Sequence, residues 1–343
     1  MKAIRHLRVL FAFGILSLVI PVHAFPFASP SLPVGMVSFT FDDGRDGQRT
    51  IAADLLGSYS IQATAFDYVS SLAKGRGFMT LTQLRELKDV YGWEIGDHTY
   101  THPNLDSMTG QQLQQEIVGS KTEFTKLGFD VTTFAYPFSH GRGNGAVTRL
   151  IRQNYLGARS AATSQRAYLY DGSSDVYNIV ANNVANTIAP GTVEGWIDRA
   201  VSQRKLLVLL FHQIVEDNAS FDTFYLAADL SVIVSYVHEK IVQGVLEAAS
   251  FRQSIETLSK AGTTNVASLV PMEGLFFGII GIVVGGLVSV MMLRIRTTPK
   301  RRLPSDGHIH CQSHNTIMIA RAGLRLENRT RSFGHLIRGA GFR

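Results

Sequence analysis

Cysteine is almost absent from this sequence. The 343 residues contain only one, Cys311, so no intrachain disulfide can form, and the fold has to be stabilised by a hydrophobic core. Apolar residues make up 45% of the chain, which is enough to build such a core. Internal repeats are also absent, so we expect an ordinary globular domain.

The middle of the chain has no net positive charge. The formal net charge of +6 arises at the two ends: residues 294–343 hold 11 basic and 2 acidic residues, and residues 1–24 hold 3 basic ones. The remaining residues, 25–293, hold 19 basic and 25 acidic residues. The basic isoelectric point is therefore no sign of nucleic-acid binding, and we expect no nucleic-acid partner.

Long apolar runs are few, and two of them predict export and a membrane anchor. Residues 1–24 combine a basic start, an apolar stretch and a small-residue cleavage site, which is the pattern of a secretory signal peptide. Residues 274–293 form an uncharged run of 20 residues. At about 1.5 Å per residue this run spans about 30 Å and predicts a transmembrane helix, with a buried core helix as the alternative. The basic residues after it predict that the main domain faces outward.

These features divide the chain into five parts. We expect a signal peptide at 1–24, one domain at 25–258, a flexible linker at 259–273, a transmembrane helix at 274–293 and a basic, disordered tail at 294–343.

Strand-like and helix-like segments alternate within the main domain. Apolar, β-branched runs at 37–41, 63–69 and 206–211 are interleaved with helical patterns such as 82–90 and 109–127. This order predicts a parallel α/β sheet, either open or closed.

Two adjacent carboxylates end the first predicted strand. Asp42 and Asp43 follow the run 37–41, and a strand directs neighbouring side chains to opposite faces. One carboxylate could then bind a cation while the other takes a proton. By itself, Asp-Asp-Gly is more often a solvated turn.

Two histidines form the second half of a candidate metal site. The i, i+4 spacing of His98 and His102 predicts that both imidazoles lie on one face of a helical turn. Two histidines and one carboxylate are a common ligand set for a hydrolytic Zn²⁺ with an open position for water. All the candidate residues, including Tyr136 and His212, follow strand-like runs, where the active sites of α/β barrels collect.

Three motifs in this order resemble the polysaccharide deacetylase family, also called the NodB homology or carbohydrate esterase 4 family. They are Thr-Phe-Asp-Asp-Gly at 40–44, His-Thr-Tyr-Thr-His-Pro at 98–103 and Phe-His at 211–212. The resemblance covers about residues 34–258 and implies an irregular (β/α) barrel of about seven units.

The resemblance also implies a role for each of these residues. Asp43, His98 and His102 would hold Zn²⁺, with Co²⁺ or Mn²⁺ as alternatives. Asp42 would take the proton from a water molecule on the metal, and His212 would protonate the departing amine or alcohol.

The third motif departs from the family pattern. Residues 135–138 read Ala-Tyr-Pro-Phe where the family has Arg-x-Pro-Tyr, so the arginine is missing and the tyrosine is a phenylalanine. We expect Tyr136 and Phe138 to line the substrate groove, and the resemblance implies that the backbone N–H at Phe138 meets the oxyanion. Arg159, at the end of another probable strand, is our candidate to replace the missing cation.

The fourth motif, an Asp-Trp pair that orients the late histidine in the family, has no clean match. Asp198, near Trp196, is the nearest candidate, and Asp171 and Asp175 are alternatives. Asp97 is a candidate for orienting one of the ligand imidazoles.

The sequence thus predicts a metal-dependent hydrolase that removes acetyl groups from N- or O-acetylated polysaccharide outside the cell. The alternative is a membrane-tethered glycan-binding protein with an inactive deacetylase fold. The reason to consider it is the arginine missing from the third motif. Hydrolysis of a small amide or ureide is a third hypothesis, against which the predicted export argues. The particular glycan and the oligomeric state stay open.

Overall fold

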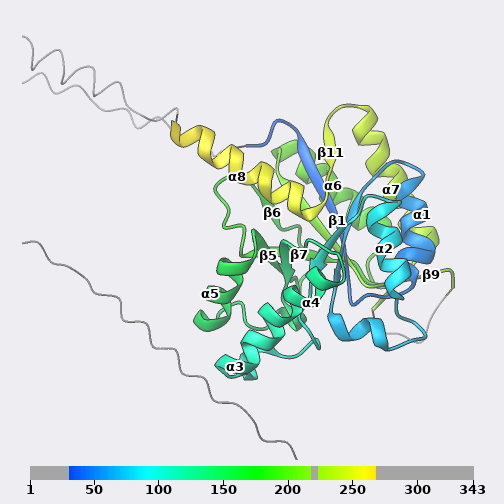
Figure 1. The fold of residues 1–343 in the computed structure, drawn as a ribbon. Coiled ribbons are helices and arrows are strands. Elements are labelled where there is room, and N and C mark those ends of the chain that lie inside the picture. Colours follow the sequence, from blue (N-terminus) through cyan, green and yellow to red (C-terminus); the bar gives the residue numbers. More distant parts are fainter. Residues whose placement is uncertain (1–30, 218–222, 268–343) are drawn as a thin grey trace, which may run out of the picture. The chain divides into compact units, whose positions relative to one another are not determined.

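Seven parallel strands close into a barrel in the computed structural model, which describes residues 31–217 and 223–267 (Figure 1). Each strand pairs with the next, and the last one returns to the first, where Met36–Phe41 pair with Leu206–Phe211. The predicted parallel α/β class is confirmed, in its closed form. The barrel strands are β1 (Gly35–Asp42), β2 (Ala63–Asp67), β3 (Glu94–Asp97), β4 (Thr133–Ala135), β5 (Gly157–Ala161), β7 (Ile179–Asn183) and β8 (Leu206–Phe211).

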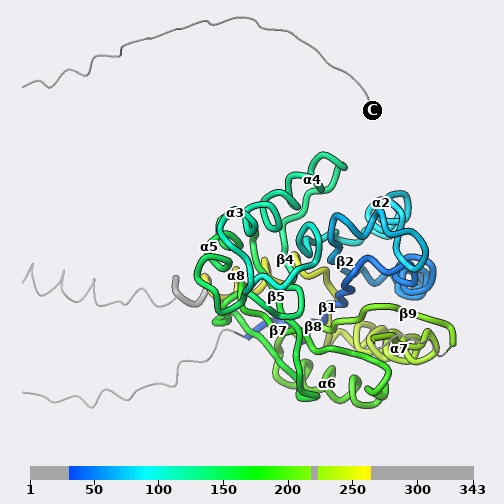
Figure 2. The backbone as a smooth tube through the Cα atoms, turned by 90° about the horizontal axis from the view of Figure 1, so that it is seen from below, coloured from blue at the N-terminus to red at the C-terminus, as the bar shows by residue number. Residues whose placement is uncertain are grey.

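Helices surround the strands, as the view in Figure 2 shows. The predicted helix at 109–127 is present as three consecutive segments, the middle one a π-helix, and Gln112 Oε1 accepts the backbone N–H of Thr109 at its start (2.9 Å). The helical segments are η1 (Gln48–Ala52), α1 (Ala53–Gly57), α2 (Leu81–Asp89), α3 (Gly110–Leu113), η4 (Gln114–Gly119), α4 (Ser120–Lys126), α5 (Gly145–Asn154), α6 (Pro190–Gln203), α7 (Ala227–Val242) and α8 (Phe251–Ala267).

Short elements complete the chain. The strand β6 (Leu169–Tyr170) pairs antiparallel with β8, and β11 (Leu246–Ala248) extends the sheet beside the start of β1. The others are the strands β9 (Gln213–Val215) and β10 (Phe224–Leu226) and the 3₁₀ turns η2 (Val69–Ala73), η3 (Leu105–Ser107) and η5 (Pro137–Ser139).

Alternate residues of β1 enter two different hydrophobic clusters. Val37, Phe39 and Phe41 pack among the side chains of α6 and α7, outside the barrel. Met36 packs in the interior cluster, with every second residue of β7 and β8. Side chains alternate along a strand, so every second residue of these strands points into the barrel. The inward-pointing residues at the carboxyl ends of β1, β7 and β8 therefore face the same end of the barrel interior. Full burial of each large apolar side chain contributes about 1.5–3 kcal/mol.

The helix α8 closes the interior cluster near the amino-terminal ends of the strands. Phe251, Ile255 and Leu258 are buried in that cluster, and the backbone N–H of Phe251 donates to Thr64 Oγ1 in β2 (2.8 Å). The opposite, carboxyl-terminal end of the barrel is the end where the predicted site residues lie.

The flexible linker predicted at 259–273 is wrong over its first part, because residues 259–267 continue α8. Ala261 packs against the interior cluster, and Gly262 lies so close to Gly172 that a Cβ on Gly172 would come within 2.6 Å of the Gly262 nitrogen. These contacts favour the helix over the flexible conformation that its small, polar residues suggested. The predicted signal peptide (1–24), transmembrane helix (274–293) and tail (294–343) lie outside the described residues. Within 31–217 and 223–267, no helix has the length and apolarity needed to cross a bilayer.

Candidate active site

A pocket of about 350 Å³ opens at the carboxyl-terminal end of the barrel. Five residues that the sequence singled out line it together although they come from three distant segments: Asp42, Asp43, His98, His102 and His212. The barrel explains this meeting, because β1, β3 and β8 all run in the same direction and end at the same rim.

Asp43, His98 and His102 form the one cluster among the described residues with the composition and spacing of a metal site. The Nε2 atoms of His98 and His102 lie 3.1 Å apart, and Asp43 Oδ1 lies 3.7 Å and 3.2 Å from them, respectively. Ligand atoms about 2.0–2.1 Å from a tetrahedral Zn²⁺ lie about 3.3 Å from one another. The three side chains therefore fit a divalent cation without rearrangement.

The protonation of these ligands also suits a cation. His98 Nδ1 lies 2.8 Å from the carbonyl oxygen of Ala135, and because a carbonyl can only accept, Nδ1 carries the proton and Nε2 presents its lone pair to the cluster. Burial lowers the pKa of His98 to about 4, against the charges of Asp42 and Asp43. The imidazole is thus neutral near pH 7, as a metal ligand has to be.

The Asp43 carboxylate is ionised in this setting. Burial raises its pKa, but the hydrogen bond from His102 and the nearby His98 and His212 outweigh that effect, so the pKa lies well below the ordinary value of 3.8. The ionised Asp43 carboxylate and the neutral His98 imidazole thus suit two of the three positions in the ligand set that the sequence predicted.

The backbone conformation of both pairs differs from our prediction. His98 and His102 lie in a loop after β3 instead of a helical turn, and Thr99 (φ 77°) and His102 (φ 64°) adopt left-handed conformations. Asp43 (φ 74°) also leaves the strand geometry, so its carboxylate and that of Asp42 face the same pocket and not opposite sides. Sequence spacing could not reveal these turns, because left-handed conformations are rare outside glycine.

The guanidinium of Arg159 forms an ion pair with the carboxylate of Asp42. Its Nη1 donates to Asp42 Oδ2 (3.1 Å) and its Nη2 to Oδ1, and both side chains are buried. The guanidinium also stacks over the ring of Phe66, with 4.4 Å from Cζ to the ring centroid. In the parallel pairing of β4 with β5, Arg159 is the partner of Ala135, the position where the family motif has its arginine. This contact agrees with the prediction that Arg159, on the neighbouring strand, takes the place of the missing arginine.

Phe138 and Tyr136 lie at the pocket in different ways. Phe138 has a left-handed backbone (φ 53°), its side chain is 64% exposed, and its ring centroid lies 4.5 Å from that of His102. Tyr136 lines the pocket, but its ring packs against Phe134 in a hydrophobic cluster, 5.4 Å between centroids. Phe138 is therefore a rim residue, whereas Tyr136 belongs to the wall.

The acidic residues that we considered for orienting the late histidine all have partners elsewhere, so these predictions are wrong. None of them lines the pocket. Each lies on an outer helix or loop, where a basic side chain neutralises it. The three pairs are Asp198–Lys240 (2.9 Å), Asp171–Lys205 (3.0 Å) and Asp175–Arg152 (2.6 Å).

Asp97 does not bind an imidazole either. It accepts the Thr99 backbone N–H (2.8 Å) and the hydroxyl protons of Ser120 (2.7 Å) and Tyr155 (2.7 Å). Asp97 therefore stabilises the loop that carries His98. The prediction that it orients a ligand imidazole is wrong, because the Ala135 carbonyl fixes the His98 ring.

Asn183 is a site residue that our sequence analysis missed. It lines the pocket at the end of β7, where it pairs with Leu210, two residues before His212. Its Oδ1 is buried and has no hydrogen-bond partner among the described residues. The inward alternation Ile179, Ala181, Asn183 along β7 is the signal that could have identified it.

Comparisons with known proteins agree with the motifs. The family model described as polysaccharide deacetylase matches residues 30–156, which confirms the family resemblance over this part of the chain. The matched part contains the three candidate metal ligands and ends before β5, so Arg159, Asn183 and His212 lie beyond it.

Several curated proteins and solved structures are similar to parts of the chain. Peptidoglycan-N-acetylglucosamine deacetylase PgdA of Listeria monocytogenes is 29% identical over 119 residues, 34% of this chain and 23% of that protein. The bifunctional xylanase/xylan deacetylase of Cellvibrio japonicus is 24% identical over 196 residues, 49% of this chain and 28% of that protein. A family 4 carbohydrate esterase from Streptomyces lividans, solved with acetate, superposes with a TM-score of 0.41 at 17% identity, covering 64% of this chain and 95% of that one. The chain thus spans only about a quarter of the length of these two curated relatives.

Proposed function

We propose that this protein is a metal-dependent deacetylase that hydrolyses acetyl groups on polysaccharide. The observation that carries the proposal is the cluster of Asp43, His98 and His102, with a second carboxylate, Asp42, beside it but outside the ligand set. A metal-binding site without catalysis needs no such second carboxylate, whereas hydrolysis needs a base within reach of the attacking water.

In this proposal Asp43, His98 and His102 hold a divalent cation. When bound, the cation supplies Lewis acidity, which lowers the pKa of water and polarises the acetyl carbonyl. Two imidazoles and one carboxylate favour Zn²⁺, and Co²⁺ and Mn²⁺ are the alternatives.

Asp42 is the base in this scheme. Two N–H groups of Arg159 fix its carboxylate, and Asp42 Oδ2 lies 3.8 Å from His98 Nε2, at the edge of the ligand cluster. The carboxylate is thus positioned to take a proton from a water molecule that attacks the acetyl carbon. Arg159 keeps the base oriented and balances its negative charge in the buried site.

His212 is the acid. When the bond from the acetyl carbon to nitrogen or oxygen breaks, the departing atom needs a proton, and His212 lines the pocket outside the ligand cluster with an imidazole that can donate one. Asn183, on the same inward face, offers Oδ1 as an acceptor for a proton donor in the pocket. The products are acetate and the free amine or hydroxyl of the glycan.

The backbone of Phe138 provides the oxyanion contact in this proposal. The left-handed turn at Phe138 and Ser139 (φ 53° and 63°) directs the chain along the pocket rim, and a backbone N–H there can stabilise the negative oxygen of the tetrahedral intermediate. The exposed ring of Phe138 then faces the glycan.

The substrate we propose is an acetylated polysaccharide of the extracellular space. The names of the relatives mention N-acetylglucosamine in peptidoglycan and acetylated xylan, so both N-acetyl and O-acetyl substrates belong in the test. Export by the segment 1–24 and anchoring by the run 274–293 rest on the sequence pattern.

Acetate release tests the proposal directly. The purified full-length protein, loaded with Zn²⁺, Co²⁺ or Mn²⁺, is incubated with acetylated chitin, peptidoglycan and xylan oligosaccharides, and acetate is measured. We expect release with one of these metals, its loss on chelation and its recovery when the metal is restored. Glycan binding without acetate release under all three metals would instead favour the glycan-binding alternative.

A further inference from the structure

The loop between His98 and His102 is hydrogen-bonded to a buried carboxylate, that of Glu116, which is not among the predicted site residues. Glu116 accepts the backbone N–H of Tyr100 (3.0 Å) and of Thr101 (2.8 Å) at Oε2, and the Thr101 hydroxyl (2.8 Å) at Oε1. The Glu116 carbonyl is within 3.1 Å of the Tyr100 N–H as well. Only 7% of the Glu116 surface is exposed. Both N–H groups in the middle of the loop therefore depend on this residue.

The loop needs such support because its backbone is strained. Thr99 (φ 77°) and His102 (φ 64°) are both left-handed, which costs about 1–2 kcal/mol for a non-glycine residue. Asp97 holds the Thr99 N–H, and Thr99 Oγ1 accepts the His102 N–H (3.0 Å). These bonds are local to the loop, whereas Glu116 ties the loop to a helix.

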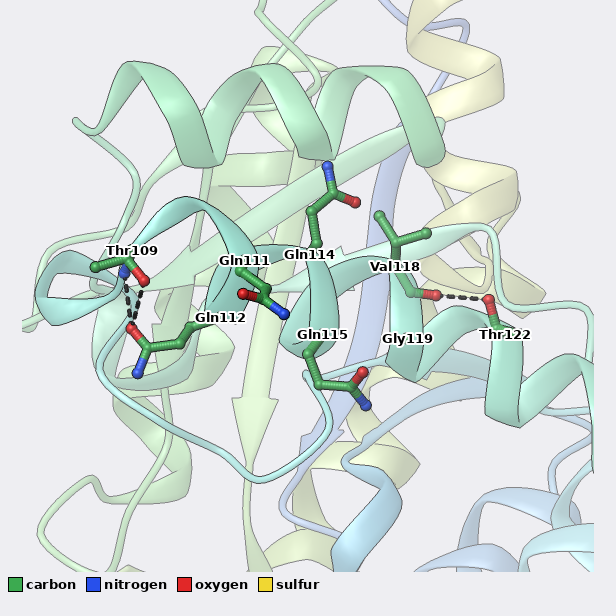
Figure 3. Close-up of a pocket in the computed structure, with 8 residues that line it drawn as sticks. All are labelled: Thr109, Gln111, Gln112, Gln114, Gln115, Val118, Gly119 and Thr122. Atoms are coloured by element: carbon green, nitrogen blue, oxygen red, sulfur yellow. Dashed lines mark hydrogen bonds between the residues drawn. The ribbon is translucent and has the colours of Figure 1, made fainter. Parts of the chain in front are cut away.

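The helix presents Glu116 through a π-helical segment. Within η4 (Gln114–Gly119), Glu116 and Ile117 are buried, whereas Gln114 and Gln115 are exposed. Figure 3 shows these two glutamines extending from the segment in opposite directions, beside a shallow pocket on its outer surface. A π-turn carries one residue more than an α-turn, which shifts the helix face, and such turns occur frequently at functional sites.

We propose that Glu116 is a positioning residue for the metal centre: it holds residues 99–102 in the conformation in which His102 Nε2 meets His98 and Asp43. This inference rests on the proposed metal site. It adds to that site a supporting residue that follows His102 by 14 positions in the sequence. Because Glu116 touches neither the cation nor the pocket, its removal weakens metal binding through the loop alone.

A matched control residue lies at the other end of the same strand, β3. Glu94 is partly buried and also accepts three bonds, from the hydroxyls of Thr64 (2.8 Å) and Thr133 and from the Arg252 N–H (2.7 Å). It begins the strand that His98 follows, so it lies far from the pocket rim along β3. Loss of either carboxylate removes an acceptor of three hydrogen bonds, but of these two residues only Glu116 contacts the ligand loop.

The experiment measures the affinity of full-length protein for Co²⁺ and Zn²⁺ by competition with a chelator, together with the Co²⁺ absorption spectrum and the melting temperature. We expect Glu116→Ala to weaken metal binding about 10- to 100-fold and to change the Co²⁺ spectrum. Glu94→Ala should lower the melting temperature and leave both metal readouts unchanged. Glu116→Gln, which keeps an accepting oxygen, should fall between wild type and Glu116→Ala, and it serves as the test if the alanine variant does not fold.

Two results would overturn the inference: a folded Glu116→Ala or Glu116→Gln with wild-type affinity and spectrum, or an equal loss of affinity in Glu94→Ala. A wild-type protein that binds no cation would overturn the metal site itself and, with it, the role of Glu116. These outcomes are distinct, because the first two leave the wild-type site intact.

Discussion

Arg159 lies directly opposite Ala135 in the pairing of β4 with β5, and its guanidinium contacts the carboxylate of Asp42. Arg159, 117 residues after Asp42 in the sequence, is thus placed on the next strand where it can supply the cation that the family motif has on β4. A parallel barrel permits this exchange because register partners on adjacent strands direct their side chains to the same face. The missing arginine is therefore no reason to expect an inactive site.

This geometry predicts the effect of moving the arginine. Arg159→Ala leaves the buried Asp42 without its partner, which should cost about 3–5 kcal/mol of stability and reduce acetate release about 100-fold or more. Adding Ala135→Arg to that variant should restore part of both, since the new guanidinium starts from the neighbouring register position. Urea unfolding and acetate assays measure the two effects. A double variant no better than Arg159→Ala would argue against equivalence of the two positions.

Asp42→Asn should separate catalysis from metal binding. We expect acetate release to fall about 10²- to 10⁴-fold, because the amide cannot take a proton, while the cation stays bound by the three ligands. Asp43→Asn is the matched control, and it should lose the metal. Metal content by elemental analysis and acetate release by enzymatic assay distinguish the two variants, and loss of metal from Asp42→Asn would contradict the assignment of ligand and base.

Asn183 should affect catalysis without affecting metal affinity. Its buried Oδ1 has no partner among the residues that the structure describes, so we expect a donor on His212 or on the substrate to use it. Asn183→Ala should lower kcat/KM about 10-fold or more, as expected for the loss of about 1.5–3 kcal/mol of a hydrogen bond to a charged group. Asn182→Ala is not a suitable control, because that side chain bonds Tyr168 and Val208. Thr163→Ala, on the pocket wall, is a better one. Unchanged kinetics for Asn183→Ala would exclude the role.

Glu94, partly buried at the start of β3, should make stability depend on pH in a defined direction. Burial raises its pKa above the ordinary value of 4.5, despite hydrogen bonds from Thr133, Arg252 and Thr64. The folded state therefore holds the proton more tightly than the unfolded state does. The stabilisation is complete below pH 4.5 and is lost as the pH rises through the folded-state pKa. Glu94→Gln cannot titrate, so the difference in unfolding free energy between wild type and this variant should shift against wild type above pH 4.5. A difference that is constant from pH 4 to 8 would contradict this prediction.

Much of the architecture followed from local sequence patterns. The apolar run at 206–211 and the alternation of strand-like and helix-like segments predicted parallel strands, and β8 and the closed sheet confirm them. Burial of both faces explains why β8 could be predicted: this strand lies between the barrel interior and the outer helices, and all of its residues are apolar. The cluster of candidate metal ligands was predictable for a different reason, because ligand chemistry restricts the residue types that can form it.

Conformation and pairing between distant segments were decided by the tertiary structure. The left-handed turns at Thr99 and His102 contradict the helix that their spacing suggested, and they depend on Glu116 in a helix that comes later in the chain. The first part of the predicted linker became helical because α8 could pack against the barrel interior.

The sequence by itself thus determined which residues could bind a cation and which segments could be buried strands, since both depend on residue type and local period. Only the folded barrel decided that Arg159 would meet Asp42 and that Asn183 would face the pocket. Contacts of this kind depend on strand register and on the closure of β8 onto β1, and no local pattern encodes the distance between segments that far apart.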